Sequence, residues 1–192
     1  MSGRIIIARH GNTFAADEAP RRIGARTDLP LVASGRAQAI ALGAHFRTRG
    51  LDFAHCLTSP LRRTRETAAL VLDGAPCPIE AADWLVEIDH GPDEGRTEDE
   101  VRARIGSDAL AAWERDATPP IDWTVNAEAR RAAWALCFGE AAALGGTMLV
   151  VTSNGAARFA APGAGRLRTG AYGEVVISAN APPQVVAWDV RP

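Results

Sequence analysis

Short apolar runs alternate along this chain with segments of helical periodicity, and this alternation limits the fold more than any other feature of the sequence. Three of the runs, residues 5–8, 53–58 and 147–152, are predominantly apolar, and each is followed by polar residues. Strands that alternate with helices are typical of α/β proteins, in which helices cover a largely parallel sheet. We therefore predict an α/β fold with a mostly parallel central sheet.

The length of the chain favours one domain. With 192 residues, 47% of them hydrophobic, it can bury one sizeable core and is short for two. The sequence has no internal repeat and no long linker. We predict a single domain over residues 1–192.

Two helical segments in the first half carry start signals. Residues 35–47 have helical spacing, with Ser34 as the expected N-cap. Their buried stripe is expected at Ala37, Ile40, Ala41 and Ala44. The next helix is expected to begin at Ser59 and Pro60, as N-cap and first helical residue. Its buried face is expected at Leu61, Thr64, Ala68, Val71 and Leu72.

Further elements follow in the second half. The capping-box pattern of residues 97–100 predicts a helix start, and the spacing of residues 129–137 predicts another helix. Two closing strands are expected at residues 173–178 and 184–188, on either side of a turn at residues 180–183.

Composition excludes several classes of partner. A formal net charge of −2 gives no reason to expect a nucleic acid or a membrane surface. No apolar run approaches the roughly 18 residues that span a bilayer, and the first residues lack the long apolar segment of a secretory signal. We expect a soluble, cytoplasmic protein.

The three cysteines, Cys56, Cys77 and Cys137, are widely spaced and form no CxxC pair. Cys56 lies in a strand-like run and Cys137 on an apolar helical stripe, so both are interpreted as small core residues. No disulfide and no metal site are expected.

The first apolar run ends in a cation and an imidazole, in the stretch IIIARHGNT at residues 5–13. Open α/β sheets bind ligands in the crevice at the carboxyl ends of their strands, so we expect His10 in such a crevice. Gly11 would allow a sharp backbone turn beside it, and Arg9 would favour an anion. A lone histidine is more often structural than catalytic, so this interpretation depends on its neighbours.

The stretch SPLRRTRETA, residues 59–68, is the second indication of an anion site. Arg62 and Arg63 fall in the first turn of a predicted helix, where the partial positive charge of the helix makes them unfavourable unless an anion is present. A phosphate would meet free N–H groups and guanidinium groups together. The alternative is a solvated basic face, which suits Arg62 and Arg65 better than Arg63.

Four motifs in order, RHGNT at residues 9–13, GARTDLPLVASGRAQA at 24–39, SPLRRTRETA and LVEIDHGPDEG at 85–95, give the chain a family resemblance. It resembles the histidine phosphatase superfamily, also called phosphoglycerate mutase-like. The second half is similar mainly in its pattern of helix, strand and closing hairpin. The resemblance implies a three-layer fold with helices on both faces of the sheet.

The resemblance also assigns roles to residues. It implies that His10 attacks a phosphoryl group and becomes a phosphohistidine, with Arg9 and Arg63 binding the phosphoryl oxygens. Asn12 and Thr13 fall where the family often places further polar contacts to phosphate. Arg21 resembles the arginine of the RxxG pattern, although Arg22 lies next to it and the assignment can shift by one residue.

Glu87 occupies the position of the proposed general acid, which would protonate the departing alkoxide. A carboxyl group with that role should have its pKa raised by burial, because an exposed glutamate is ionised at neutral pH. The alternative is a loop carboxylate paired with an arginine. Glu94 is interpreted as a helix-start residue.

The chain departs from the family at its second histidine, which normally follows a late core strand in a VxHG pattern. Here residues 151–155 read VTSNG, so Ser153 stands in its place. A serine hydroxyl can donate one hydrogen bond but carries no positive charge. Loss of a preorganised donor costs on the order of 10² to 10³ in rate, about 3 to 4 kcal/mol. Asn154 is an alternative donor.

Other cations are candidates for compensation. Arg158, Arg166 and Arg168 lie in a glycine- and proline-rich segment that is shorter than the helix of the family, and a solvated surface loop is the alternative for each. His90, which lies close to Glu87 in sequence, is a second and weaker candidate for compensation. His45 and His55 are interpreted as structural.

Two hypotheses about function remain open. The first is a phosphomonoester hydrolase of reduced or specialised activity, which needs no metal or cofactor because its catalysis is covalent. The second is a pseudophosphatase that binds a phosphorylated ligand without turnover. A mutase is less favoured, because the insertions of the sugar-acid mutases are not evident. The expected partner is a small phosphorylated substrate or inorganic phosphate, and a homodimer is compatible with the sequence.

Overall fold

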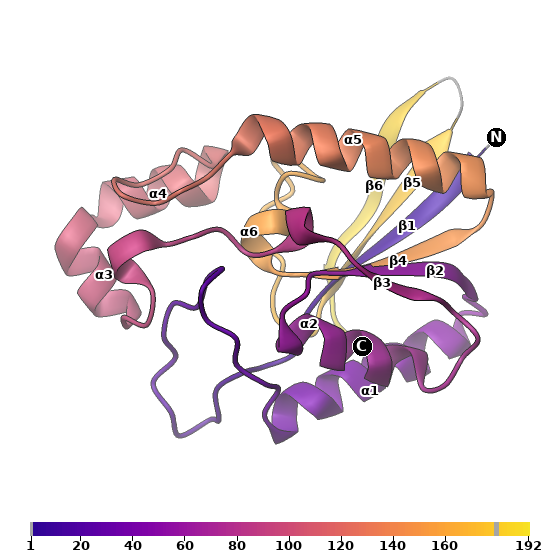
Figure 1. The fold of residues 1–192 in the computed structure, drawn as a ribbon, viewed down its shortest axis with the longest axis horizontal. Coiled ribbons are helices and arrows are strands. Elements are labelled where there is room, and N and C mark those ends of the chain that lie inside the picture. Colours follow the sequence, from indigo (N-terminus) through magenta and orange to yellow (C-terminus); the bar gives the residue numbers. More distant parts are fainter. Residues whose placement is uncertain (1, 179–180) are drawn as a thin grey trace.

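The computed structural model describes residues 2–178 and 181–192, and within them a six-stranded sheet runs in the order β3-β2-β4-β1-β5-β6 (Figure 1). The strands are β1 (Ser2–Arg9), β2 (Phe53–Thr58), β3 (Ile79–Ala81), β4 (Thr147–Thr152), β5 (Tyr172–Ser178) and β6 (Ala181–Val190). The first four pair in parallel, whereas β5 and β6 run antiparallel. The prediction of a mostly parallel sheet is confirmed.

Helices cover both faces of this sheet. They are α1 (Ala33–Thr48), α2 (Arg62–Leu72), α3 (Glu98–Ile105), α4 (Ser107–Asp116), α5 (Ala127–Leu144) and α6 (Asn154–Ala157), with 3-10 turns η1 (Asp83–Leu85) and η2 (Gly91–Asp93). In Figure 1, α1 and α2 lie below the sheet and α5 lies above it, while α3 and α4 extend beyond one end. The fold is therefore the predicted three-layer α/β arrangement.

The apolar run of β1 is explained by burial on both faces. Ile5 and Ile7 pack in the cluster that includes α5, whereas Ile6 and Ala8 pack in the cluster beneath α1 and α2. Because successive side chains of a strand point to opposite faces, a strand between two helical layers must be apolar at every position. The same alternation holds in β4.

The predicted face of α1 is wrong. The helix buries Gly35, Ala39, Leu42, Gly43 and Phe46, and the stripe predicted at Ala37, Ile40, Ala41 and Ala44 is exposed. Alanine occurs on several sides of this helix, so the apolar pattern alone cannot orient it. The bulky Leu42 and Phe46 contribute more buried apolar area than alanines and decide which face packs.

The start of α2 lies two residues later than predicted, because Leu61 rather than Ser59 precedes the first helical residue. The predicted buried face of this helix is correct at all five positions. The predicted capping box of α3 is confirmed, with Thr97 and Glu100 bonded reciprocally.

Other predictions have mixed outcomes. Cys56 and Cys137 are buried, as predicted. Of the turn predicted at residues 180–183, Asn180 lies outside the described residues, and 181–183 already belong to β6. No helix in the described ranges is long and apolar enough to cross a membrane.

Candidate active site

A cavity of about 850 Å³ lies beyond the carboxyl ends of β1 and β4. Of the eight residues to which the family resemblance assigns roles, six line it: Arg9, His10, Asn12, Thr13, Arg21 and Glu87. The other two, Arg63 and Ser153, are buried at 0% and 1% exposure and are not among the lining residues, although the charge of Arg63 acts on His10. Distant parts of the chain therefore meet at one end of the sheet.

His10 is held in one protonation form. It follows β1, and its backbone N–H donates to the carbonyl of Thr152, at the end of β4. Its Nδ1 lies 2.8 Å from the carbonyl oxygen of Gly11. A carbonyl only accepts, so Nδ1 carries the hydrogen and the neutral ring keeps a lone pair on Nε2. Burial, with the charges of Arg63 and Arg9, holds the pKa of His10 well below its usual range.

Gly11 connects the nucleophile candidate to two helices. Its N–H donates to the hydroxyl of Thr67 in α2. A Cβ on Gly11 would lie 2.3 Å from the carbonyl oxygen of Gly35 in α1. The glycine is therefore required for close approach of the backbones. Its φ is not positive, so the sharp turn expected here is not what requires it.

Arg9 and Arg63 bring two positive charges to His10. The NH1 group of Arg9 donates to the carbonyl of Leu167, and its Nε is buried without a partner among the described residues. Burial, followed by the charge of Arg166, lowers the pKa of Arg9 to about 10. Arg63 is fully buried, and its Nε also lacks a partner. Buried, incompletely bonded guanidinium groups favour an anion.

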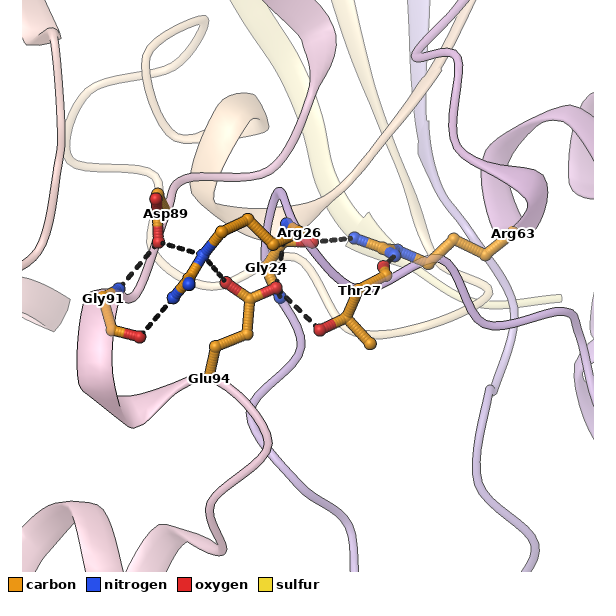
Figure 2. Close-up of polar contacts among 7 residues, drawn as sticks. All are labelled: Gly24, Arg26, Thr27, Arg63, Asp89, Gly91 and Glu94. Carbon is orange, nitrogen blue, oxygen red and sulfur yellow. Dashed lines mark hydrogen bonds and ion pairs between the residues drawn. The ribbon is translucent and has the colours of Figure 1, made fainter.

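A loop at residues 24–27 positions Arg63 (Figure 2). The guanidinium group of Arg63 donates to the carbonyls of Thr27 at 2.6 Å and Gly24 at 3.1 Å. Glu94 fixes this loop, because its carboxylate accepts from the N–H groups of Gly24 and Arg26 and from the Thr27 hydroxyl. Glu94 follows η2, so its predicted role at a helix start is wrong.

Arg26 ties the same loop to the segment that follows Glu87. Its Nε lies 3.1 Å from Oδ1 of Asp89, and its NH2 donates to the carbonyl of Gly91 (Figure 2). The phosphate-clamp candidate Arg63 and the acid candidate Glu87 are thus placed by one connected loop network.

Glu87 is held as an anion. Its carboxylate accepts from the N–H of Ile88 at 2.8 Å and from the N–H of Gly155 at 3.0 Å. Burial alone would raise the pKa of Glu87, but the charge of His90, these two hydrogen bonds and Arg63 together lower it below its usual value. The expectation of a raised pKa is therefore wrong, because the burial of this carboxylate is outweighed by donors and cations.

Ser153 directly follows β4, next to the strand that carries His10. Its hydroxyl is buried and has no hydrogen-bond partner among the described residues. Asn154 lines the cavity, and its Oδ1 accepts from the N–H of Leu167 at 2.8 Å. The amide of Asn154 therefore uses its acceptor to fix the loop before β5 and leaves its NH₂ group for other contacts.

The remaining polar candidates differ in how firmly they are placed. Asn12 accepts a hydrogen bond from the hydroxyl of Thr169 at 2.6 Å and donates to Ser34. Arg21 is exposed and donates to the carbonyl of Gly95 at 2.9 Å. Arg22 instead pairs with Glu98 and stacks on Trp123 at 4.8 Å. The structure gives Arg21 the freer guanidinium group.

The other cations also separate. Arg158 pairs with Glu114 and stacks on Trp113 at 4.1 Å, and Arg168 pairs with Asp189. Neither lines the cavity, whereas Arg166 and His90 do. His90 is buried at 5% exposure, with its Nδ1 unpartnered among the described residues.

Sequence reasoning missed the residues that act through tertiary contact. Asp28 accepts from the N–H of Arg62 at 2.6 Å, so a carboxylate of the chain itself stabilises the first turn of α2. Thr67, Glu94 and Gly155 orient His10, Arg63 and Glu87 respectively. Of these residues only Glu94 could have been found from the local sequence, because it is a carboxylate in the turn-rich motif LVEIDHGPDEG.

Comparison with known proteins gives three results. A family model described as the Histidine phosphatase superfamily (branch 1) matches residues 5–189. A 2,3-bisphosphoglycerate-dependent phosphoglycerate mutase of Methylobacterium sp. (strain 4-46) is 36% identical over 132 residues, which cover 62% of this chain and 59% of the relative. The chain thus spans less than two thirds of the length of that curated relative.

Solved structures with the same fold include a mycobacterial hydrolase, with a TM-score of 0.84, 19% identity and 100% of both chains covered. They also include a mycobacterial glucosyl-3-phosphoglycerate phosphatase, with a TM-score of 0.81, 19% identity, and coverage of 99% of this chain and 100% of the other. At such identity the likeness concerns the fold.

Proposed function

The chain belongs to the histidine phosphatase superfamily, and from that premise we propose that it hydrolyses small phosphomonoesters through a phosphohistidine intermediate on His10. The observation that carries the proposal is the state of His10. Its imidazole is neutral, its Nδ1–H is engaged by Gly11, and its Nε2 lone pair is available beside two guanidinium groups.

The first step forms a bond between Nε2 of His10 and phosphorus and breaks the ester P–O bond. Arg9 and Arg63 stabilise the negative charge on the phosphoryl oxygens. Glu87 protonates the leaving oxygen. Although its pKa is low in the protein alone, a phosphoryl dianion bound beside it raises the pKa, because a nearby like charge disfavours the ionised form.

The second step releases phosphate. Water attacks phosphorus, the N–P bond breaks, and the ionised Glu87 takes a proton from the water. His10 returns to its neutral form with Nδ1 still bonded to Gly11. Neither step requires a metal ion or a cofactor, because the catalysis is covalent.

The cavity supports a substrate larger than phosphate itself. Its volume of about 850 Å³ falls in the usual range for small-molecule sites, about 300 to 1,000 Å³. Mutase activity is the less favoured alternative, because a mutase must also return the phosphoryl group to a second hydroxyl, and the insertions of the sugar-acid mutases are not evident in the sequence.

A pseudophosphatase is the second candidate function. Glu87 is held as an anion, and the buried hydroxyl of Ser153, which the resemblance places at the position of the family's second histidine, is neutral. Both features favour weak turnover while leaving Arg9 and Arg63 able to bind phosphate.

Hydrolysis of p-nitrophenyl phosphate by the pure protein, with His10→Ala and His55→Ala in parallel, tests the proposal. We expect turnover in the wild type, none in His10→Ala, and normal turnover in His55→Ala, because His55 lies in β2 and pairs with Glu80. Rapid quenching should trap an acid-labile phosphoryl group on the wild type only. Equal turnover in His10→Ala would refute the mechanism, and phosphate binding without turnover would favour the pseudophosphatase.

A further inference from the structure

Arg166 lines the cavity, is exposed, and takes no part in the proposed two-step hydrolysis. It belongs to the segment between α6 and β5, and its exposed side chain lines the cavity together with Arg9, His10 and Glu87. The motifs of the first half of the chain do not include it. Its position follows only from how the late loop packs.

The backbone on both sides of Arg166 is fixed. Leu167 is fully buried, its N–H donates to Asn154, and its carbonyl accepts from NH1 of Arg9 at 2.8 Å. On the other side, the carbonyl of Gly165 accepts from the indole N–H of Trp188 at 3.2 Å. Arg166 is therefore presented on a rigid segment that Arg9 itself holds, and only its side chain needs to reorient.

The charge of Arg166 is not compensated by the protein. Within residues 2–178 and 181–192, no carboxylate forms an ion pair or hydrogen bond with its guanidinium group. Arg158 and Arg168 of the same segment do have such partners, in Glu114 and Asp189. Four carboxylates line the cavity, and each is already bonded elsewhere: Glu18 to the N–H of Ala15, Glu87 to backbone N–H groups, Glu98 to Arg22 and Glu114 to Arg158.

Arg166 also lies close enough to repel Arg9. Its charge lowers the pKa of Arg9, second only to burial and ahead of the effect of Arg63. The carboxylates of Glu87 and Glu114 act in the opposite direction on the pKa of Arg9, but burial and the neighbouring arginines outweigh them. An anion bound between Arg9 and Arg166 is therefore favoured, because it would offset the repulsion between two like charges. A bound phosphoryl group would remove that repulsion.

We propose that Arg166 binds the transferred phosphoryl group as a third guanidinium, and supplies there the positive charge that Ser153 does not. This inference rests on the proposed function and deepens it. The segment between α6 and β5 thus supplies a positive charge that Ser153, after β4, does not carry. Because the side chain is exposed until the anion arrives, Arg166 completes the site as the phosphoryl group enters.

Three variants test this role: Arg166→Ala, Arg166→Lys and the matched control Arg168→Ala. The control removes a positive charge from the same segment, but wild-type Arg168 pairs with Asp189 and does not line the cavity. We expect Arg166→Ala to lower kcat/KM for p-nitrophenyl phosphate by about 10- to 100-fold, somewhat less than loss of a fully buried donor. Arg166→Lys should retain part of the activity, since it keeps a point charge without the planar fork. Added guanidinium ion should partly rescue Arg166→Ala.

Anion affinity gives a second readout that does not need turnover. Calorimetric titration with inorganic phosphate and with orthovanadate should show weaker binding to Arg166→Ala than to the wild type or Arg168→Ala, with the larger loss for orthovanadate, which mimics the transition state. Unchanged kcat/KM and unchanged affinity in Arg166→Ala, or an equal loss in Arg168→Ala, would overturn the inference.

These outcomes separate the inference from the proposed function. If His10→Ala abolishes turnover while Arg166→Ala behaves as wild type, hydrolysis stands and the role of Arg166 fails. If the wild type binds phosphate without turnover and Arg166→Ala binds it more weakly, the hydrolase proposal fails and Arg166 remains an anion-binding residue.

Discussion

One hydrogen bond fixes the tautomer of His10, the proposed nucleophile. The bond from Nδ1 to Gly11 fixes the tautomer, and Gly11 is itself held by Thr67 and packed against Gly35. Burial and two neighbouring arginines then keep the ring neutral. The two arginines proposed to bind phosphate therefore also keep the proposed nucleophile unprotonated.

The pH dependence of His10 follows with a definite sign. Because its pKa lies well below the usual range, the imidazole should stay neutral at about pH 6.5, the ordinary midpoint for histidine. Protonation should begin only at lower pH. We expect Arg63→Gln, which removes a positive charge, to raise the pKa of His10, whereas Arg65→Gln on the outer side of α2 should not. NMR titration of the imidazole measures both, and an ordinary midpoint in the wild type would contradict the prediction.

Gly155 is the residue on which the placement of Glu87 depends. A Cβ there would lie 1.9 Å from Oε1 of Glu87, and the N–H of Gly155 donates to the other carboxylate oxygen. We expect Gly155→Ala to displace the carboxylate and lower kcat by about 10²-fold, the usual effect of a misplaced catalytic group. Gly139→Ala is the control, because a Cβ there meets no atom within 4 Å. Steady-state kinetics check this, and a fully active Gly155→Ala would mean that Glu87 is not the acid.

At the level of elements, a buried carboxylate connects η2, α3 and the loop before α5. Asp93 is fully buried, pairs with Arg104 of α3, and accepts from the indole N–H of Trp123 at 2.7 Å. Burial alone would raise the pKa of Asp93, but its bonds to Arg104 and Trp123 lower it. This contact holds α3 to the segment that carries Glu87 and Glu94.

Removing that carboxylate should destabilise the fold more than it changes the chemistry. We expect Asp93→Ala to lower the free energy of unfolding by about 3 kcal/mol, because it leaves Arg104 without its buried partner. A lowered pKa in the folded state adds stability above about pH 4 that is lost as the pH falls further. Urea denaturation at pH 7 and in acid measures this: the wild type should exceed Asp93→Ala in free energy of unfolding by less in acid than at pH 7. A constant difference at both pH values would contradict this explanation.

How well each element could be predicted depended on how local its determinants are. The capping box of α3 and the strands β2 and β4 depend on neighbouring residues and were predicted correctly. The face of α1 was not, because only packing against the sheet distinguishes Leu42 and Phe46 from the surrounding alanines. The cap of α2 was missed because Asp28, which bonds Arg62, lies 34 residues away.

At the scale of the whole molecule, six of the eight residues given roles from the sequence line one cavity, but their electrostatics were not predicted. The ends of β1 and β4 had to meet, given a parallel sheet, and His10 does lie beside Thr152. The low pKa of Glu87 depends on Gly155, His90 and Arg63, which no local pattern joins. Arg166 and Arg9 are brought together only by the path of the loop before β5.

Because these arginines come from distant parts of the chain, phosphate should stabilise the whole fold by binding them together. A ligand at about 100 times its Kd adds about 2.7 kcal/mol of stability, or roughly 5 to 10 °C in Tm for a chain of this size. We expect inorganic phosphate to raise the Tm of the wild type. The rise should be much smaller in Arg9→Gln, because this variant lacks the Arg9 guanidinium group, which bonds Leu167 and lines the cavity. Sodium chloride at equal ionic strength is the control for screening. An equal rise with chloride would mean that salt in general relieves the repulsion among cations. An equal rise in Arg9→Gln would mean that the cavity beside Arg9 is not the phosphate site.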